Sequence, residues 1–187
     1  MSSRFERTGS ETLHEGRLFS VRRDTFRHED GEDAERELVS HPGAVGIVAL
    51  DGDRLWFVRQ PREAVGAPDL LEIPAGKLDE EGEEPLDTAK RELAEEIGKE
   101  ADDWEPLGSF YTSPGFTDEQ VHLFLATGIS DVDERPEVDE NERIDVETRP
   151  LDDLDLLIAE ATDSKTIIGL ARLRLLLAER ELLPPGD

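Results

Sequence analysis

The stretch that most constrains this chain reads GKLDEEGEEPLDTAKRELAEEIG, an acidic loop leading into a helix. Its apolar residues recur every three or four positions, which predicts one buried helical stripe made of Leu86, Ala89, Leu93 and Ile97. Pro85 is typical of a first helical turn and Gly98 of a helix end. We therefore expect a helix between Pro85 and Gly98 that packs by one face against the rest of the protein.

Three glutamates share one edge of this predicted helix. At about 100° per residue, Glu92, Glu95 and Glu96 fall within a sector of roughly 100° beside the apolar stripe. Like charges at this spacing destabilise a helix by roughly 0.2–0.5 kcal/mol per pair. A hard divalent cation reverses that penalty, and Mg²⁺ is commonly held by a few carboxylates while it takes up phosphate oxygens. We interpret the edge as a metal and pyrophosphate site, with Arg91 bracing a neighbouring carboxylate; the alternative is a solvated acidic face.

The order of residues in this stretch resembles the Nudix box, in which Gly, Glu, an Arg-Glu pair, a Glu-Glu pair and a second Gly stand at fixed separations. Glu83 and the run Arg91-Glu92-Leu93-Ala94-Glu95-Glu96-Ile97-Gly98 match the box in register. There are two departures: six residues instead of five separate Gly76 from Glu83, and Lys99 occupies the last aliphatic position. The extra residue falls in a loop, where an insertion costs little free energy.

Length and composition narrow the class of protein. At 187 residues the chain is one ordinary domain, or one domain with a small appendage, and it is long enough to bury a core. The sequence has no cysteine, which excludes disulfides, thiolate metal sites and a cysteine nucleophile. No apolar run approaches the roughly 20 residues that span a bilayer, and the first residues lack the apolar segment of a signal peptide. We expect a soluble cytoplasmic protein.

The net charge of −26 argues against nucleic-acid and anionic-membrane partners, because both require basic surface. It does not argue against a phosphate substrate, since local arginines and metal ions reverse the sign at one site. Acidic residues are spread along the chain, and most of the 21 basic residues are arginine. Our hypothesis is adaptation to high salt, where a Debye length of roughly 3 Å at 1 M screens the self-repulsion. The hypothesis predicts unfolding in low salt.

The first 42 residues contain two strand-like pieces, 18–26 and 35–39, on either side of a polar turn. A two-stranded hairpin is marginal alone. We expect it to pack on the main domain or on a second subunit, with a dimer favoured.

Residues 43–187 predict strands interleaved with helices, which indicates an α/β fold. The expected elements are a buried strand at 44–50, a turn at 51–53, a returning strand from 55, a strand end at 70–75, an irregular strand at 104–111, a strand at 121–126, a short strand at 144–146, and helices at 151–161 and 166–182. We expect the Ala75 carbonyl to face the metal. Arg59 and Arg62 end the returning strand, where they could lie near the acidic helix; the alternative is that they are ordinary surface arginines. The charged stretch 131–142 is predicted to be a mobile, solvated loop.

The flanking segments extend the resemblance to the ADP-ribose pyrophosphatase branch of the Nudix hydrolases, over most of the chain. They are Arg36-Glu37, the run His41-Pro42-Gly43-Ala44-Val45, Arg62, the run Leu71-Glu72-Ile73-Pro74-Ala75-Gly76, and Pro114, which stands 16 residues after Gly98. The resemblance implies an α/β/α sandwich with a mixed sheet for residues 43–187. It also implies that residues 1–42 form a small N-terminal β extension, exchanged between the subunits of a homodimer.

The resemblance further implies Mg²⁺-dependent hydrolysis of ADP-ribose to AMP and ribose 5-phosphate, with Mn²⁺ as a possible substitute. The implied metal ligands are the Ala75 carbonyl, Glu92, Glu95 and Glu96, and Glu96 is also an implied catalytic residue. Substrate contacts are implied for Arg36, Arg62 and Pro114, and Glu140 and Glu142 resemble a loop pair that supplies a catalytic base or a further metal ligand. Such chemistry requires no serine, histidine or cysteine nucleophile.

Two other functions stay open. One is a pyrophosphatase for another nucleoside diphosphate sugar, because the box binds only the shared diphosphate. The second is a catalytically silent nucleotide sensor, although all three helix glutamates are present, and the loss of one of them would have indicated a sensor. A purely structural dimer module has no need of clustered carboxylates.

Overall fold

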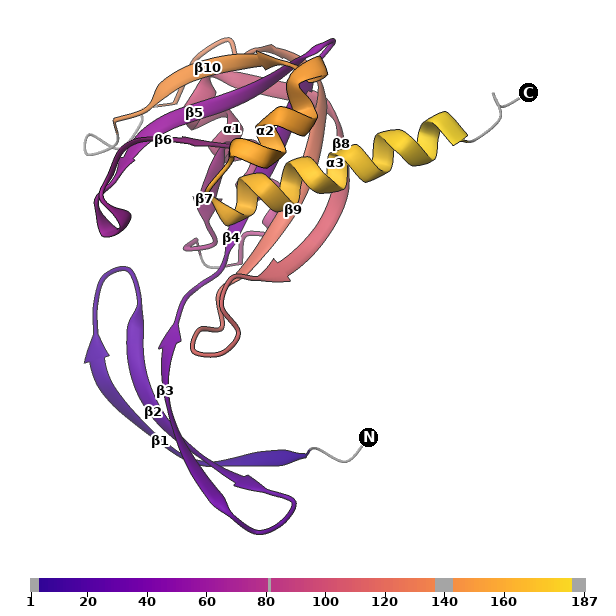
Figure 1. The fold of residues 1–187 in the computed structure, drawn as a ribbon. Coiled ribbons are helices and arrows are strands. Elements are labelled where there is room, and N and C mark those ends of the chain that lie inside the picture. Colours follow the sequence, from indigo (N-terminus) through magenta and orange to yellow (C-terminus); the bar gives the residue numbers. More distant parts are fainter. Residues whose placement is uncertain (1–3, 81, 137–142, 183–187) are drawn as a thin grey trace. The chain divides into compact units, whose positions relative to one another are not determined.

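The computed structural model describes residues 4–80, 82–136 and 143–182, with the backbone alone at 181 and 182. The chain divides into two compact units (Figure 1). Unit 1 comprises Met1–Gly43 and Phe110–Gln120, and unit 2 comprises Ala44–Ser109 and Val121–Asp187.

Unit 1 contains a three-stranded antiparallel sheet of β1 (Phe5–Glu15), β2 (Ser20–His28) and β3 (Asp33–Ser40). The sequence analysis predicted β2 and β3 but not β1. Every residue of β1 is exposed, so the strand lacks the alternation of apolar and polar residues that usually reveals one. Its pairing with β2 is what makes this segment a strand.

The segment 110–120 of unit 1 is tied to the end of β3. Val39 N donates to Phe116 O at 2.7 Å, and Asp118 N donates to Val39 O at 3.3 Å. The Asp118 carboxylate accepts hydrogen bonds from Ser40 Oγ and His41 N, both at 2.9 Å. Together these bonds fix the segment against β3 by backbone and side chain alike.

Unit 2 is built on a mixed seven-stranded sheet. The order is β10-β5-β4-β9-β8, with β6 also paired to β5 and β7 to β4. The pair β4–β9 is parallel, whereas β4–β5, β4–β7, β5–β6 and β5–β10 are antiparallel. The strands are β4 (Ala44–Asp51), β5 (Arg54–Arg62), β6 (Ala67–Glu72), β7 (Ala75–Lys77), β8 (Lys99–Tyr111), β9 (Gln120–Asp131) and β10 (Asp145–Pro150).

Helices cover both faces of this sheet, as the alternation of side chains along β4 shows. Val45, Ile47 and Ala49 belong to one buried cluster with Ala89, Leu93 and Ile97 of α1 (Pro85–Ile97). On the opposite face, a Cβ placed on Gly169 of α3 (Ser164–Leu182) would lie 3.0 Å from Val48. Figure 1 shows α2 (Leu154–Glu160) and α3 across the near face of the sheet. The expected α/β/α sandwich is confirmed.

Most predicted elements of unit 2 are present, with differences in their bounds. The strand end expected at 70–75 is two strands, β6 and β7, and the strand expected at 144–146 is β10. The β4–β5 hairpin turns at Gly52, whose φ of 57° suits glycine. The expected irregular strand at 104–111 is instead the continuous β8, which begins at Lys99 and runs through Pro106. Because β8 ends the strand order, a proline is tolerated there. The helix expected at 151–161 begins as a short 3-10 turn (Leu151–Asp153) before α2; another such turn, Glu63–Val65, follows β5.

None of the helices that the structure describes is long and apolar enough to cross a membrane.

Candidate active site

The acidic loop and helix form as the sequence predicts. Pro85 occupies the first turn of α1, and Gly98 ends the helix with a φ of 67° while its N–H donates to Ala94 O. Ala89 and Leu93 are fully buried against the sheet. The helix is therefore anchored by its apolar face, and its carboxylates stand along the neighbouring edge.

Arg91 is the hub of these carboxylates. Its Nη1 donates to Glu92 Oε1 at 2.9 Å and to Glu95 Oε2 at 3.1 Å. Its Nε and Nη2 donate to Glu83 Oε1 at 3.4 Å and Oε2 at 3.2 Å. The predicted bracing role of Arg91 is confirmed, and Glu83 reaches Arg91 despite the additional residue in the loop that precedes it.

These contacts shift the ionisation of both partners. Burial by itself lowers the pKa of Arg91, but its hydrogen bond to Glu83 and the charges of Glu92 and Glu95 outweigh burial and raise that pKa. The pKa of Glu83 is lowered, first by the hydrogen bond from Arg91 and then by one from Thr88 Oγ1, which lies 2.8 Å away. Arg91 is thus a permanent cation among the helix glutamates.

Glu96 joins the helix to β7. Its side chain is only 4% exposed, and its Oε2 accepts a hydrogen bond from Ala75 N at 2.8 Å. At the next residue, a Cβ added to Gly76 would lie 1.9 Å from Glu92 Cδ. Glycine is therefore required at position 76 for the Glu92 carboxylate to lie against the β7 backbone.

Arg135 adds a contact at the end of α1 that the sequence analysis did not predict. Its Nη2 donates to Glu95 O at 3.0 Å and to Glu96 O at 2.7 Å, and its Nε donates to Glu95 O at 3.1 Å. A guanidinium at this end satisfies terminal carbonyls and complements the negative end of the helix dipole.

Arg62 lies at the end of β5 and is held by a buried partner. Its Nε and Nη2 donate to the two carboxylate oxygens of Glu72, at 2.6 and 2.7 Å. The hydrogen bond and charge of Glu72 raise the pKa of Arg62, with smaller contributions from the charges of Asp163 and of Glu96 in the acidic helix. Arg59, for which the sequence left both possibilities open, pairs with Glu147 and Asp69.

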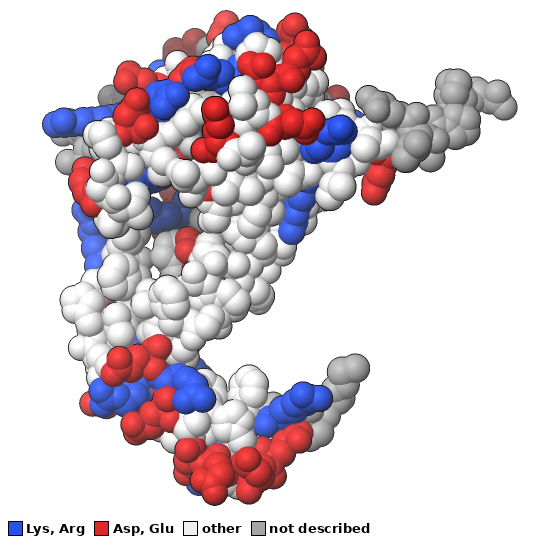
Figure 2. Space-filling view, in the orientation of Figure 1, with Lys and Arg blue, Asp and Glu red and all other residues white. Residues whose placement is uncertain are grey.

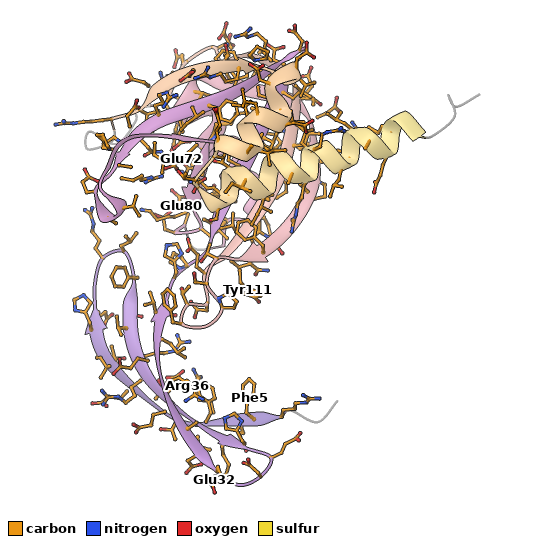
Figure 3. All side chains as sticks on the ribbon, viewed as in Figure 1. Phe5, Glu32, Arg36, Glu72, Glu80 and Tyr111 are labelled. Atoms are coloured by element: carbon orange, nitrogen blue, oxygen red, sulfur yellow. The ribbon has the colours of Figure 1, made fainter. Side chains whose placement is uncertain are left out.

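Figure 3 shows two labelled residues of this region, Glu72 at the end of β6 and Glu80 in the loop after β7. Sequence analysis did not single out Glu72 for a role. A signal existed, because a glutamate between Leu71 and Ile73 in an apolar strand requires a charged partner if it is buried.

The remaining predicted site residues are distributed as follows. Arg36 lies on β3 and Pro114 in the segment 110–120, so both belong to unit 1 (Figure 3 labels Arg36). Glu140 and Glu142 lie outside the described residues, as does the whole of 137–142 within the predicted loop 131–142. Ala75, Glu92, Glu95 and Glu96 are brought together at β7 and α1.

Residues 40–169 match the family model of the NUDIX domain, which is more than half of the chain. The chain belongs to the Nudix family. The glutamates around Arg91 are therefore those of a Nudix box, with Gly76 and Gly98 at its two ends.

Three curated proteins are similar to this chain over much of its length. The ADP-ribose pyrophosphatase of Mycobacterium tuberculosis is 48% identical over 139 residues, which cover 74% of this chain and 66% of that protein. The methanol dehydrogenase activator of Bacillus methanolicus is 40% identical over 169 residues, covering 89% of this chain and 90% of that protein. The ADP-ribose pyrophosphatase of Bacillus subtilis is 40% identical over 179 residues, covering 94% and 96%.

A solved structure, that of an ADP compounds hydrolase, superposes with a TM-score of 0.83. It covers 97% of this chain and 98% of its own, at 23% sequence identity. This likeness establishes the fold.

Nudix hydrolases as a class use divalent metal ions, and the oxygen donors of this box suit such a cation. Among the described residues, no group of three or more His, Asp or Glu side chains forms a preassembled metal cage. Arg91 instead takes one oxygen each from Glu92 and Glu95. Mg²⁺ normally binds through one or two carboxylates and retains waters, so the donor set fits it without such a cage.

Proposed function

We propose that this protein hydrolyses the diphosphate of ADP-ribose, releasing AMP and ribose 5-phosphate. The observation that carries the proposal is the Nudix box itself, with Glu92, Glu95 and Glu96 gathered on one edge of α1 beside the bare backbone of Gly76. The similarity to the pyrophosphatases of M. tuberculosis and B. subtilis supports ADP-ribose as the substrate.

Glu92, Glu95, Glu96 and the Ala75 carbonyl would hold the metal, which we propose is Mg²⁺, with Mn²⁺ as a substitute. When bound, the cation would neutralise the diphosphate and polarise its phosphorus atoms. Arg91 supports the donors by bonding to one carboxylate oxygen each of Glu92 and Glu95, which holds the two side chains close together. Glu96, through Ala75 N, fixes the distance between helix and strand.

Arg62 would bind the anionic diphosphate, because its side chain is 42% exposed while Glu72 fixes the orientation of its guanidinium. Arg36 and Pro114 are proposed substrate contacts from unit 1. The segment that carries Pro114 is bonded to the same strand, β3, that carries Arg36. Unit 1 therefore presents these two residues on one connected piece of structure.

In the proposed reaction the oxygen of water bonds to one phosphorus as the bond from that phosphorus to the bridging oxygen breaks. A carboxylate accepts the proton of the attacking water, and we propose Glu140 or Glu142 for this role by their resemblance to the loop pair of relatives. Replacing each of the two by Gln in turn identifies the base. Only the variant that lacks the base should lose the increase of the reaction rate with pH.

We further propose a cytoplasmic homodimer with exchanged N-terminal strands. Support comes from β1, an edge strand with every residue exposed, and from the exposed apolar side chains Phe5, Leu13, Leu18 and Phe19. Light scattering coupled to size-exclusion chromatography tests this, and a monomer at micromolar concentration would contradict it. Removal of residues 1–15 should then give a monomer.

Adaptation to high salt is proposed on the charge distribution. Figure 2 shows acidic side chains over α2 in unit 2 and, in unit 1, around the β2–β3 turn. Their mutual repulsion is screened by salt. The melting temperature should rise with KCl, and a melting temperature independent of KCl would remove this proposal.

The first experiment is to measure AMP release from ADP-ribose with Mg²⁺ in high KCl, comparing the wild type with Glu96→Gln. Loss of the charge should lower the rate by orders of magnitude, because Glu96 would bind the metal and also holds the backbone of Ala75 in position. Glu84→Gln is the matched control, since Glu84 is exposed at the start of the same helix and makes no side-chain capping bond.

The outcomes separate the remaining functions. Turnover by the wild type and by Glu84→Gln, but not by Glu96→Gln, supports the hydrolase. A panel of nucleoside diphosphate sugars then identifies the preferred substrate by kcat/KM, and a higher value for another sugar would replace ADP-ribose. Binding of ADP-ribose without turnover would favour a silent sensor, and absence of binding would discard the ADP-ribose assignment.

A further inference from the structure

Glu72 is a buried carboxylate shared by two cations from opposite parts of unit 2. It is 1% exposed, and besides the two bonds from Arg62 it accepts a short hydrogen bond from Lys165 Nζ. Arg62 comes from β5, Glu72 from the end of β6, and Lys165 from the first turn of α3. One carboxylate thus links two strands of the sheet to the helix that covers its face.

The two cations are placed differently with respect to solvent. The side chain of Lys165 is 14% exposed, and it also pairs with Asp163 at 3.1 Å. The Arg62 side chain is 42% exposed. Lys165 is therefore the more buried of the two cations, whereas a larger part of the Arg62 side chain is open to solvent.

The ionisation of the cluster agrees with this geometry. Burial raises the pKa of Glu72, but the hydrogen bond from Arg62 and the charge and hydrogen bond of Lys165 outweigh it and lower that pKa. Without Lys165 the buried carboxylate would depend on Arg62 alone. An uncompensated buried charge is costly, so the Glu72 carboxylate would draw the Arg62 guanidinium inward. The carboxylate would then offset the positive charge of Arg62.

The backbone beneath Lys165 is fixed. Asp163 Oδ2 accepts hydrogen bonds from Thr166 N at 2.9 Å and Thr166 Oγ1 at 2.6 Å, which caps the start of α3. Thr166 Oγ1 in turn accepts a hydrogen bond from Ile73 N at 3.0 Å, in the residue after Glu72. These bonds tie the backbone next to Lys165 to the backbone next to Glu72.

We propose that Lys165 is a positioning residue for diphosphate binding, acting through Glu72 to hold the Arg62 guanidinium outward for an anionic ligand. The proposal rests on the function proposed above. Lys165 compensates part of the negative charge of Glu72. Part of the positive charge of Arg62 then stays available to an anionic ligand. Removing Lys165 should weaken substrate binding, while the carboxylates of α1, which belong to a separate cluster around Arg91, retain their arrangement.

The test is a double-mutant cycle of Lys165→Met and Arg62→Met, with KM and kcat measured for AMP release from ADP-ribose. We expect Lys165→Met to raise KM about tenfold, the size typical of coupled neighbours, with little change in kcat. In the Arg62→Met background the same change should have no further effect on KM. Lys165→Arg, which keeps a cationic donor, should restore most of the wild-type KM.

Lys90→Met is the matched control for charge. Lys90 is half exposed on α1, where it pairs with Asp87 at 4.0 Å, and its loss should leave KM unchanged. Melting temperatures establish that each variant is folded. If Lys165→Met does not fold, Lys165→Gln replaces it with the same expectation, because an amide keeps a donor to Glu72 without the charge.

Equal effects of Lys165→Met on KM with and without Arg62 would overturn the proposal, as would a fall in kcat at constant KM or an equal effect of Lys90→Met. Each of these results leaves the hydrolase assignment standing, because the wild type still turns over ADP-ribose. A wild type that does not turn over ADP-ribose overturns the hydrolase assignment, and the role of Lys165 falls with it.

Discussion

The sheets of the two units are held together by different forces. The sheet of unit 2 is apolar inside: Val45, Ile47 and Val58 are fully buried. The one residue of the β1–β3 sheet that is buried is a charged one, Asp24, which is 1% exposed and accepts hydrogen bonds from Ser10 Oγ at 2.6 Å and Arg22 Nε at 2.9 Å. The same sheet also carries ion pairs between exposed side chains, such as Arg27 with Asp33.

This difference indicates which unit contributes more to the free energy of unfolding. Apolar burial contributes about 25 cal/mol per Å² and is insensitive to salt, whereas exposed ion pairs contribute about 0–1 kcal/mol and are screened. We therefore expect unit 2 to be the stable part of the chain. Unit 1 should respond to salt, pH and a second subunit.

The largest expected effect is Leu93→Ala on the buried face of α1. Leu93 is fully buried, so the cavity should cost about 2–5 kcal/mol of unfolding free energy. Urea unfolding followed by tryptophan fluorescence measures it, because both tryptophans, Trp56 and Trp104, belong to unit 2.

Leu13→Ala makes the same truncation on β1, where the side chain is 40% exposed. It should change the free energy of unfolding far less than Leu93→Ala. If the two variants lose similar stability, Leu13 is covered in solution, and the comparison between units no longer holds.

The next effect is expected for Gly76→Ala, because the Glu92 carboxylate leaves no room for a side chain at position 76. The added Cβ would displace the Glu92 carboxylate from β7, and we expect metal affinity to fall by about 10–100-fold. Titration of Mg²⁺ or Mn²⁺ by calorimetry measures the affinity directly.

Gly9→Ala on β1 is the control, because its added Cβ comes no closer than 3.6 Å to a neighbouring atom. It should leave metal affinity unchanged. Unchanged affinity in Gly76→Ala would show that Glu92 can leave β7 without loss of the metal site.

A smaller, local effect is expected for Asp24→Asn. Burial raises the pKa of Asp24, but hydrogen bonds from Ser10 and Arg22 outweigh it and lower that pKa. Replacing the carboxylate should cost about 1.5–3 kcal/mol, the range for hydrogen bonds to charged groups. Hydrogen exchange should accelerate at the amides of β1–β3 while tryptophan fluorescence reports an unchanged unit 2.

The sign of the pH dependence follows from the same shift. A carboxylate whose folded pKa is lowered contributes stability above its unfolded pKa of about 3.9, and this stability is lost as pH falls through the folded pKa. Wild-type unit 1 should therefore loosen below about pH 4, and Asp24→Asn should show less of this loss. Equal acid sensitivity in both proteins would contradict the assignment to Asp24.

The smallest effect is expected for Arg27→Gln. The pair with Asp33 is exposed on both sides, so its removal should leave the melting temperature within experimental error in high KCl. A loss of stability that grows as KCl is removed is the expected pattern. A large loss at high salt would show that exposed ion pairs hold unit 1 more strongly than we infer.

Local elements were predictable because their causes are local. The α1 helix follows from an apolar stripe, a proline in its first turn and a glycine at its end, all within one short stretch. The β4–β5 hairpin follows from two apolar runs around Asp51-Gly52-Asp53. The edge of glutamates follows from helical periodicity alone.

Other features depended on the tertiary structure. β1 is a strand because β2 pairs with it, and its own sequence has no apolar alternation. Lys165 reaches Glu72 across 93 positions of sequence, and Arg135 reaches the end of α1 across about 40. Residue spacing cannot predict such partners, because the fold, and not the local sequence, determines which charged side chain lies beside a buried one.

The sequence by itself therefore determined the family, the acidic helix and its glutamates, since a run of residues at helical spacing carries its own geometry. Only the tertiary structure decided that Arg62 rests on Glu72 and that Lys165 completes the cluster. The physical reason is desolvation: a buried carboxylate must be neutralised by cations, and folding selects them by their position in space.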